Sequence, residues 1–131
     1  MSARLDLTRE EREELTHLLT ELAARTGRED SLAAMLGRWS AFVSTVERGY
    51  DDSIYEYTND LSVRDRLESV ATGAGPALRA KLRGALAGDD RRFQAATQEA
   101  ARPLGESGGA WWRRVPRRPV GELADDLESL G

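Results

Sequence analysis

The fold is decided by residues 32–49, which read LAAMLGRWSAFVSTVERG. The large apolar side chains here recur three or four positions apart, the spacing that places them on one face of an α-helix. They are Leu32, Met35, Leu36, Trp39, Phe42, Val43 and Val46. Asp30 or Ser31 can cap this helix, and Gly49 suits its end. Because this segment is the most hydrophobic of the chain, we expect it to form the central core helix of an all-α protein.

A first helix is predicted upstream, over residues 8–26. Thr8 and Glu11 form the sequence pattern of a capping box, in which each side chain accepts a hydrogen bond from the other residue's backbone N–H. Apolar side chains follow at helical spacing, and Gly27 is a typical residue at a helix end. The apolar positions are Leu15, Leu18, Leu19 and Leu22.

Downstream of the core helix, the pattern predicts three further helical segments before Pro103. The first spans about 52–71, either as one helix or with a break near Asn59 and Asp60. After a linker at 72–75, Pro76 suits the first position of a fourth helix, which Gly88 is expected to close. Asp89 is expected to cap a fifth helix that Pro103 stops.

The C-terminal region is predicted to have a different character. Residues 103–110 form a glycine-rich loop, residues 111–119 an extended arm because two prolines exclude a helix, and residues 121–130 a short helix. We therefore expect a bundle of about five helices over 1–102, followed by an arm and terminal helix over 103–131. This second part would pack on the same domain or on a second subunit.

The composition limits the classes of function. The chain has 131 residues, no cysteine and a net charge of −4, which argues against sequence-independent nucleic-acid binding and excludes disulfides. The sequence contains no signal peptide and no apolar stretch long enough to span a membrane, so we expect a cytoplasmic protein. Eighteen arginines against the single Lys81 indicate a bacterial genome of high GC content.

Catalytic chemistry has little support in the sequence. His17 is the single histidine, and only Glu13 and Glu21, four positions away on each side, offer it a metal-binding pattern. Such a charge-rich helical face is more typical of exposed surface. No motif indicates a cofactor or a metal, and we expect neither. A small enzyme that uses carboxylates and His17 is kept as the last alternative.

The tyrosine/acid segment, residues 50–60, is the stronger of two candidate sites. It holds all three tyrosines of the chain among four carboxylates, a mixture that suits contact with a basic protein. The residues predicted to bind the partner are Tyr50, Asp51, Asp52, Tyr55, Glu56 and Asp60. In the alternative interpretation Ile54, Tyr57 and Leu61 face the core and the acids are only solvated.

One run within this segment, Asp52-Ser53-Ile54-Tyr55-Glu56-Tyr57, resembles the acidic, tyrosine-bearing helix that colicin-type immunity proteins present to basic nuclease toxins. The likeness covers six residues, and no site residue is transferred from it. It agrees with the function we favour, a non-catalytic protein-interaction module of the immunity, antitoxin or inhibitor type.

The Trp/Arg arm is the second candidate site, read from the sequence WWRRVPRR at 111–118. Its candidate contact residues are Trp111, Trp112, Arg113, Arg114, Arg117 and Arg118. Tryptophans and arginines together can bind nucleic acid or an anionic ligand, which is the alternative function. We favour an arm whose tryptophans lie on the helical core while its arginines pair with acidic surface. Packing on a second copy, in a homodimer, is the variant of this interpretation.

Overall fold

A computed structural model describes residues 5–100, 104 and 110–129, together with the backbone of residue 130. It confirms an all-α fold, with five helices and one small two-stranded sheet in the described part of the chain. The elements are α1 (Arg9–Thr26), α2 (Leu32–Arg48), α3 (Ile54–Gly73), α4 (Pro76–Ala96), β1 (Thr97–Glu99), β2 (Arg114–Pro116) and α5 (Gly121–Leu130). The predicted loop 103–110 lies outside the described residues except for Leu104 and Ala110.

The starts of the first two helices follow the local sequence. The Thr8 hydroxyl accepts a hydrogen bond from the Glu11 amide at 3.1 Å, and the Glu11 carboxylate accepts one from the Thr8 amide at 2.8 Å. Ser31, rather than Asp30, caps α2. Gly27 ends α1 with a φ of 71°, a conformation that other residues adopt only with strain. The capping box and the end of α1 were predicted correctly.

Helix α3 is one continuous helix, so the structure bears out the first of the two alternatives and not the break near Asn59 and Asp60. Ser53 caps it, and its hydroxyl accepts the Glu56 amide at 3.2 Å. The buried face of α3 carries apolar residues together with one arginine, Arg64. The short connection to α4 ends at Gly75, and Pro76 occupies the first turn of α4 as predicted.

The division between the fourth and fifth predicted helices was wrong. Helix α4 runs unbroken through Gly84 and Gly88. Asp89 does not cap a new helix there; its carboxylate contacts the Ser40 hydroxyl at 3.4 Å and Arg92 at 2.9 Å. These contacts with neighbouring side chains outweigh the weak local preference of glycine for a helix end.

The same helix ends earlier than predicted, because residues 97–99 form a strand. β1 pairs with β2 in antiparallel register, with Gln98 opposite Val115. Thr97 is buried, and its hydroxyl donates to the Phe93 carbonyl at 2.6 Å and accepts from Arg114 Nε at 2.9 Å. The prediction of an extended arm is thus correct for β2, but its strand partner was not predicted.

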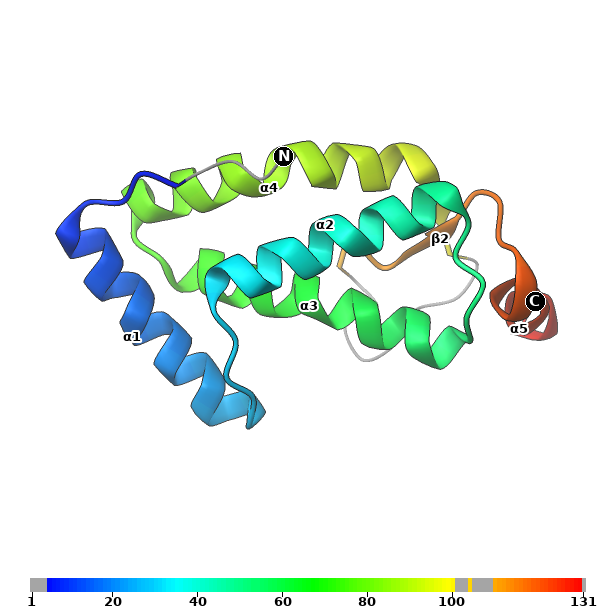
Figure 1. Ribbon diagram of the computed structural model, residues 1–131, viewed down its shortest axis with the longest axis horizontal. Coiled ribbons are helices and arrows are strands. Elements are labelled where there is room, and N and C mark those ends of the chain that lie inside the picture. The colour runs from blue at the N-terminus through cyan, green and yellow to red at the C-terminus, as the bar shows by residue number, and fades with distance from the viewer. Residues whose placement is uncertain (1–4, 101–103, 105–109, 131) are drawn as a thin grey trace.

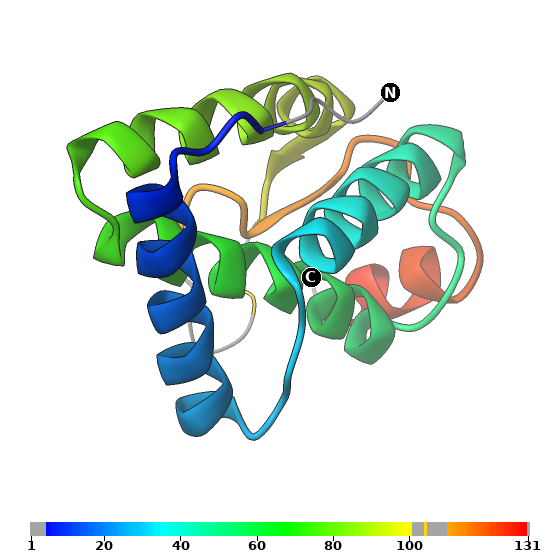
Figure 2. The ribbon, with the colours of Figure 1, turned by 60° about the vertical axis from the view of Figure 1, so that its left-hand side comes forward.

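Helices α2, α3 and α4 run side by side and enclose the core, with α1 at one end of this group and α5 at the other (Figure 1). Seen from a second direction, α1 lies across the ends of α3 and α4 (Figure 2). The centre of the core is aromatic: the rings of Trp39 and Phe93 lie 5.0 Å apart, and those of Phe42 and Tyr57 lie 5.4 Å apart. The predicted core helix, α2, supplies Trp39 and Phe42 and is central as expected.

The sequence predicted that no helix is long and apolar enough to span a membrane. Among the described residues, no helix combines the length and the apolar character needed to cross a bilayer.

Candidate functional site

The tyrosine/acid segment divides into an exposed and a buried half. Tyr55 is 82% exposed, and Asp51, Asp52 and Glu56 are exposed around it. Asp51 and Asp52 lie in the α2–α3 connection, and Tyr55 and Glu56 in the first turn of α3. A partner that approaches this end of α3 would meet one free aromatic ring among three carboxylates.

Tyr50 does not belong to that exposed group, although the sequence placed it there. It is 4% exposed and packs edge-on against Phe42 and Tyr57. Its hydroxyl donates to Asp60 at 2.7 Å, and burial together with this carboxylate raises the pKa of the Tyr50 phenol. Tyr50 is buried because its ring packs into the aromatic cluster of the core. Tyr50 therefore orients Asp60, which is half-buried, and cannot offer its own ring to a partner.

Helix α5 adds further acidic residues to the same end of the molecule. The Glu122 amide donates to the Asp51 carbonyl at 3.0 Å, and the Asp126 carboxylate accepts the Ile54 amide at 2.8 Å. Gly121 has a φ of 56°, and a Cβ there would lie 2.8 Å from that of Asp51. Only glycine permits this close docking of α5 on the start of α3.

Residues 51–60 and 121–130 together hold eight carboxylates and no lysine or arginine. We call their exposed members, with Tyr55, the acidic face. They are Asp51, Asp52, Tyr55, Glu56, Glu122, Asp125 and Glu128. Sequence reasoning missed the contribution of α5, since its acids are some seventy positions away. The only signal was the absence of basic residues from both segments.

The Trp/Arg arm packs against α3 of the same chain. Trp112 is 7% exposed, and its indole Nε1 donates to Asp65 at 2.7 Å. Arg113 is also buried and pairs with the same carboxylate. Trp111 stays partly exposed and packs edge-on against Phe93. The tryptophans thus lie on the helical core, while the carboxylate that the arm meets is Asp65 and not an acid of residues 50–60.

The remaining arginines of the arm differ in exposure. Arg114 donates to the Thr97 hydroxyl at 2.9 Å and to the Thr97 carbonyl at 3.0 Å, so it secures the strand pair. The Arg114 carbonyl accepts the Tyr57 hydroxyl at 2.6 Å, and burial raises the pKa of that phenol. Arg117 and Arg118 are exposed. A nucleic acid would therefore reach these two arginines and the edge of Trp111, whereas Trp112 and Arg113 are engaged inside the protein.

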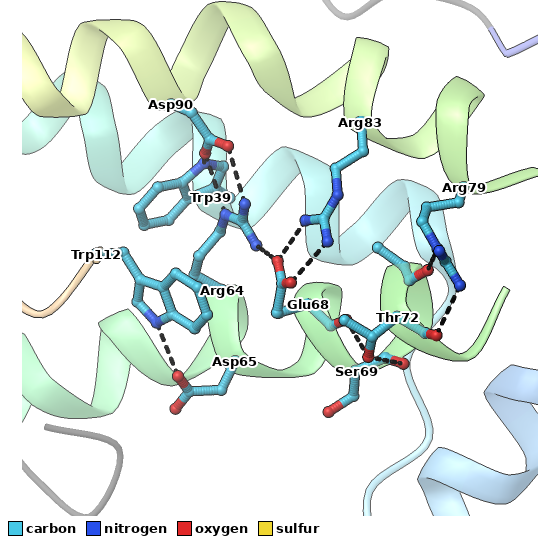
Figure 3. Close-up of polar contacts among 11 residues, drawn as sticks. Trp39, Arg64, Asp65, Glu68, Ser69, Thr72, Arg79, Arg83, Asp90 and Trp112 are labelled. Atoms are coloured by element: carbon cyan, nitrogen blue, oxygen red, sulfur yellow. Dashed lines mark hydrogen bonds and ion pairs between the residues drawn. The ribbon is translucent and has the colours of Figure 1, made fainter. Parts of the chain in front are cut away.

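Arg64 lies at the centre of a buried polar network that joins the arm to three helices (Figure 3). Its side chain is 1% exposed and donates two hydrogen bonds to Asp90, at 3.1 and 2.9 Å. Its third bond goes to Glu68 at 3.0 Å. The guanidinium carbon lies 4.8 Å from the ring centre of Trp112. The charge of Arg64 is thus satisfied by two carboxylates and an aromatic face.

The network extends outward from Arg64 on both sides. Asp90 also accepts the indole Nε1 of Trp39 at 2.9 Å. Glu68 accepts two bonds from Arg83, at 2.5 and 2.7 Å, and these bonds hold the pKa of the Glu68 carboxyl below its usual value. The network braces α2, α3, α4 and the arm against one another. The one sequence signal for it was Arg64 itself, three positions from Leu61 and from Leu67 on an otherwise apolar face.

His17 lies on the exposed outer surface of α1. Its Nε2 is 3.1 Å from Glu21, while Glu13 pairs with Arg9 at 3.4 Å. His17 is therefore not brought together with both glutamates of its sequence pattern. Within the described residues, no three histidine or acidic side chains gather so as to hold a metal ion.

Comparison with known proteins does not assign this chain to a family: no protein-family model matches it, and no curated protein or solved structure matches it. The acidic face and the Arg64 network therefore have to be interpreted from their own geometry. The network is closed and fully paired, whereas the acidic face is open.

Proposed function

We propose that this protein is a non-catalytic interaction module that presents its acidic face to a basic protein partner. The observation that carries the proposal is Tyr55, which is 82% exposed and lies between the exposed Asp51 and Asp52, just before α3, and the exposed Glu56 in its first turn. A large aromatic side chain exposed to this degree gains free energy when a partner covers it. The surrounding carboxylates would accelerate encounter with a basic surface and select against acidic ones.

The rigid support of the acidic face agrees with this role. The Tyr50–Asp60 hydrogen bond and the bond from the Ile54 amide to Asp126 of α5, both partly buried, hold the start of α3 in place. A preorganised surface loses less entropy on binding. An immunity, antitoxin or inhibitor protein, each of which holds a basic target by surface complementarity, would fit this description.

The test compares two double charge reversals that change the net charge by the same amount. Glu56→Lys with Asp125→Lys alters the acidic face at two exposed residues, one from each helix. Glu13→Lys with Glu21→Lys makes the matched change on exposed positions of α1, at the opposite end of the molecule (Figure 1). Circular dichroism checks that both variants keep the helical content of the wild type.

The readout is affinity capture followed by titration with the purified partner. We expect proteins retained by the wild type and by the α1 variant to be lost from the acidic-face variant, and the association rate with the wild type to fall as salt is raised. Tyr55→Ala should weaken the same complex by about 2 kcal/mol, the range of an interface hot spot. Identical capture by both double variants would refute the proposed function.

A further inference from the structure

A second feature of the surface is a pocket between α2 and α3, with a volume of about 410 Å³. Three arginines line it: Arg28 from the connection before α2, Arg38 from α2 and Arg66 from α3. In a protein whose net charge is −4, three guanidinium groups around one hollow are a local concentration of positive charge. We call these residues the arginine cluster.

The arginine cluster has too few carboxylates to balance its charge. Asp30 is 3.0 Å from Arg28 Nε, 3.1 Å from Arg38 and 3.6 Å from Arg66. In the described part of the chain, Asp30 is the one carboxylate in ion-pair contact with any of the three. Three guanidinium groups therefore share one acid, and each repels the other two.

Arg66 experiences this imbalance most strongly. Its side chain is 12% exposed, and its Nε atom is buried without a hydrogen-bond partner. Burial, followed by repulsion from Arg28, lowers the pKa of the Arg66 guanidinium, and Arg38 acts in the same direction. Asp30 Oδ2 is also buried without a hydrogen-bond partner, so the one carboxylate does not satisfy the cluster, and an additional anion among the three guanidinium groups would reduce their mutual repulsion.

The rest of the pocket suits the uncharged part of a ligand. Phe42, Val63 and Ala41 provide an apolar wall, and polar groups complete the lining. Asp60 lies in this lining and accepts the Tyr50 hydroxyl. Because its carboxylate would repel a second negative charge, the pocket favours a ligand with its anionic group at one end only. A few fixed polar groups beside an apolar wall are typical of small-molecule sites of this size.

We infer that this pocket binds a small organic anion, whose phosphate or carboxylate group lies among Arg28, Arg38 and Arg66 and whose apolar body packs on Phe42 and Val63. Guanidinium groups are the side chains best suited to such oxygens, because they donate paired hydrogen bonds in a fixed plane. The inference does not rest on the proposed function, since Arg28, Arg38 and Arg66 lie outside the acidic face and the pocket needs no protein partner.

The experiment titrates the full-length protein with phenyl phosphate and, separately, with benzoate, while amide resonances are followed by NMR. Inorganic phosphate and benzyl alcohol serve as the anion alone and the apolar body alone. We expect saturable shifts around the pocket with one of the two aromatic anions, and weaker effects from the other two probes. Tighter binding of phenyl phosphate would indicate a phosphate ligand, and tighter binding of benzoate a carboxylate ligand.

Two variants test the arginine cluster directly. Arg38→Gln removes one half-exposed guanidinium and should weaken binding about tenfold, the effect of losing one charged hydrogen bond. Arg48→Gln, an exposed position on the same helix, is the matched control and should leave binding unchanged. Asp30→Asn should tighten binding, because it removes the carboxylate that competes with the ligand. A purely structural role for the cluster predicts no such gain.

Three results would overturn the inference. The first is the absence of saturable shifts up to about 10 mM of either aromatic anion, which is weaker than most specific sites. The second is an equal response of Arg38→Gln and Arg48→Gln. The third is weaker binding by an Asp30→Asn protein that keeps its wild-type helical content.

Discussion

Arg64 and Arg66 are two positions apart on α3, yet their environments are opposite. Arg64 is 1% exposed and contacts two carboxylates and two indole rings, and it shares Glu68 with one other arginine, Arg83. Arg66 is 12% exposed and shares Asp30 with two other arginines. The first guanidinium is part of a complete internal network, whereas the second belongs to a cluster with an excess of positive charge.

This difference shows how burial and pairing separate structural charges from candidate functional ones. A buried ion whose partners are all present fixes the packing of the elements that supply them, here α3, α4 and the arm. Three arginines that share the single carboxylate of Asp30 repel one another, so they should contribute less to stability. The two regions should therefore respond differently to the same substitution.

The largest effect is expected from Arg64→Met, compared with Arg66→Met. Methionine keeps an apolar stem of similar length in both cases. At Arg64 it leaves Asp90 and Glu68 without their central cation, and we expect a loss of about 3–5 kcal/mol in the free energy of unfolding. At Arg66 it removes a buried charge and its repulsion with Arg28 and Arg38, so the loss should be below about 1 kcal/mol. Urea denaturation measures both values, and equal losses would remove the distinction between the two regions.

A smaller effect concerns pH and the outer part of the Arg64 network. The Arg83 and Arg64 bonds lower the pKa of Glu68 in the folded state below the ordinary value of 4.5. A carboxyl with a lowered pKa stabilises the protein above its unfolded pKa, and this contribution is lost as the pH falls through the folded pKa. Glu68→Gln should therefore cost about 1–2 kcal/mol at pH 7, because charged hydrogen bonds are lost.

The measurement is the stability of wild type and Glu68→Gln from pH 7 down to acid. The difference between the two proteins should be constant above about pH 5 and shrink below the ordinary carboxyl pKa of about 4.5. Asp125→Asn, at an exposed position of α5, is the control and should show no comparable change. A difference that does not depend on pH would contradict an ionised Glu68 in the network.

The smallest effect is expected from a substitution that tests whether α4 is continuous. This helix supplies Asp90, which accepts hydrogen bonds from Arg64. A Cβ at Gly88 would meet no atom within 4 Å, and α4 continues through this position. Gly88→Ala should raise the free energy of unfolding by about 0.5–1 kcal/mol, because alanine loses less backbone entropy in a helix.

Gly27 provides the matched control for this substitution. A Cβ there also meets no atom within 4 Å, but the residue has a φ of 71°. Gly27→Ala should therefore destabilise the protein, because a residue with a Cβ is strained in this left-handed conformation. A loss of stability in Gly88→Ala, seen by thermal unfolding, would indicate that the helix does break at Gly88.

The sequence predicted the candidate site in part. The segment around Tyr55 could be found from its tyrosines and acids, because they are close along the chain. Its division into an exposed Tyr55 and a buried Tyr50 could not, since the aromatic cluster that buries Tyr50 includes Phe42 from another helix. The Trp/Arg arm was likewise recognised, but its carboxylate partner Asp65 was not.

By itself, the sequence determined where most helices begin and end. Thr8, Gly27, Ser31 and Pro76 act within one helical turn, and the backbone groups that they satisfy or spare lie a few residues away. Tertiary structure alone decided that α4 passes Gly88, that residues 97–99 pair with the arm, and that α5 joins the acidic face. It also decided that one of two nearby arginines is fully paired and the other is not. These outcomes depend on burial and on charged partners from distant segments. The free energies of these interactions exceed local preferences, and the sequence around each residue does not reveal them.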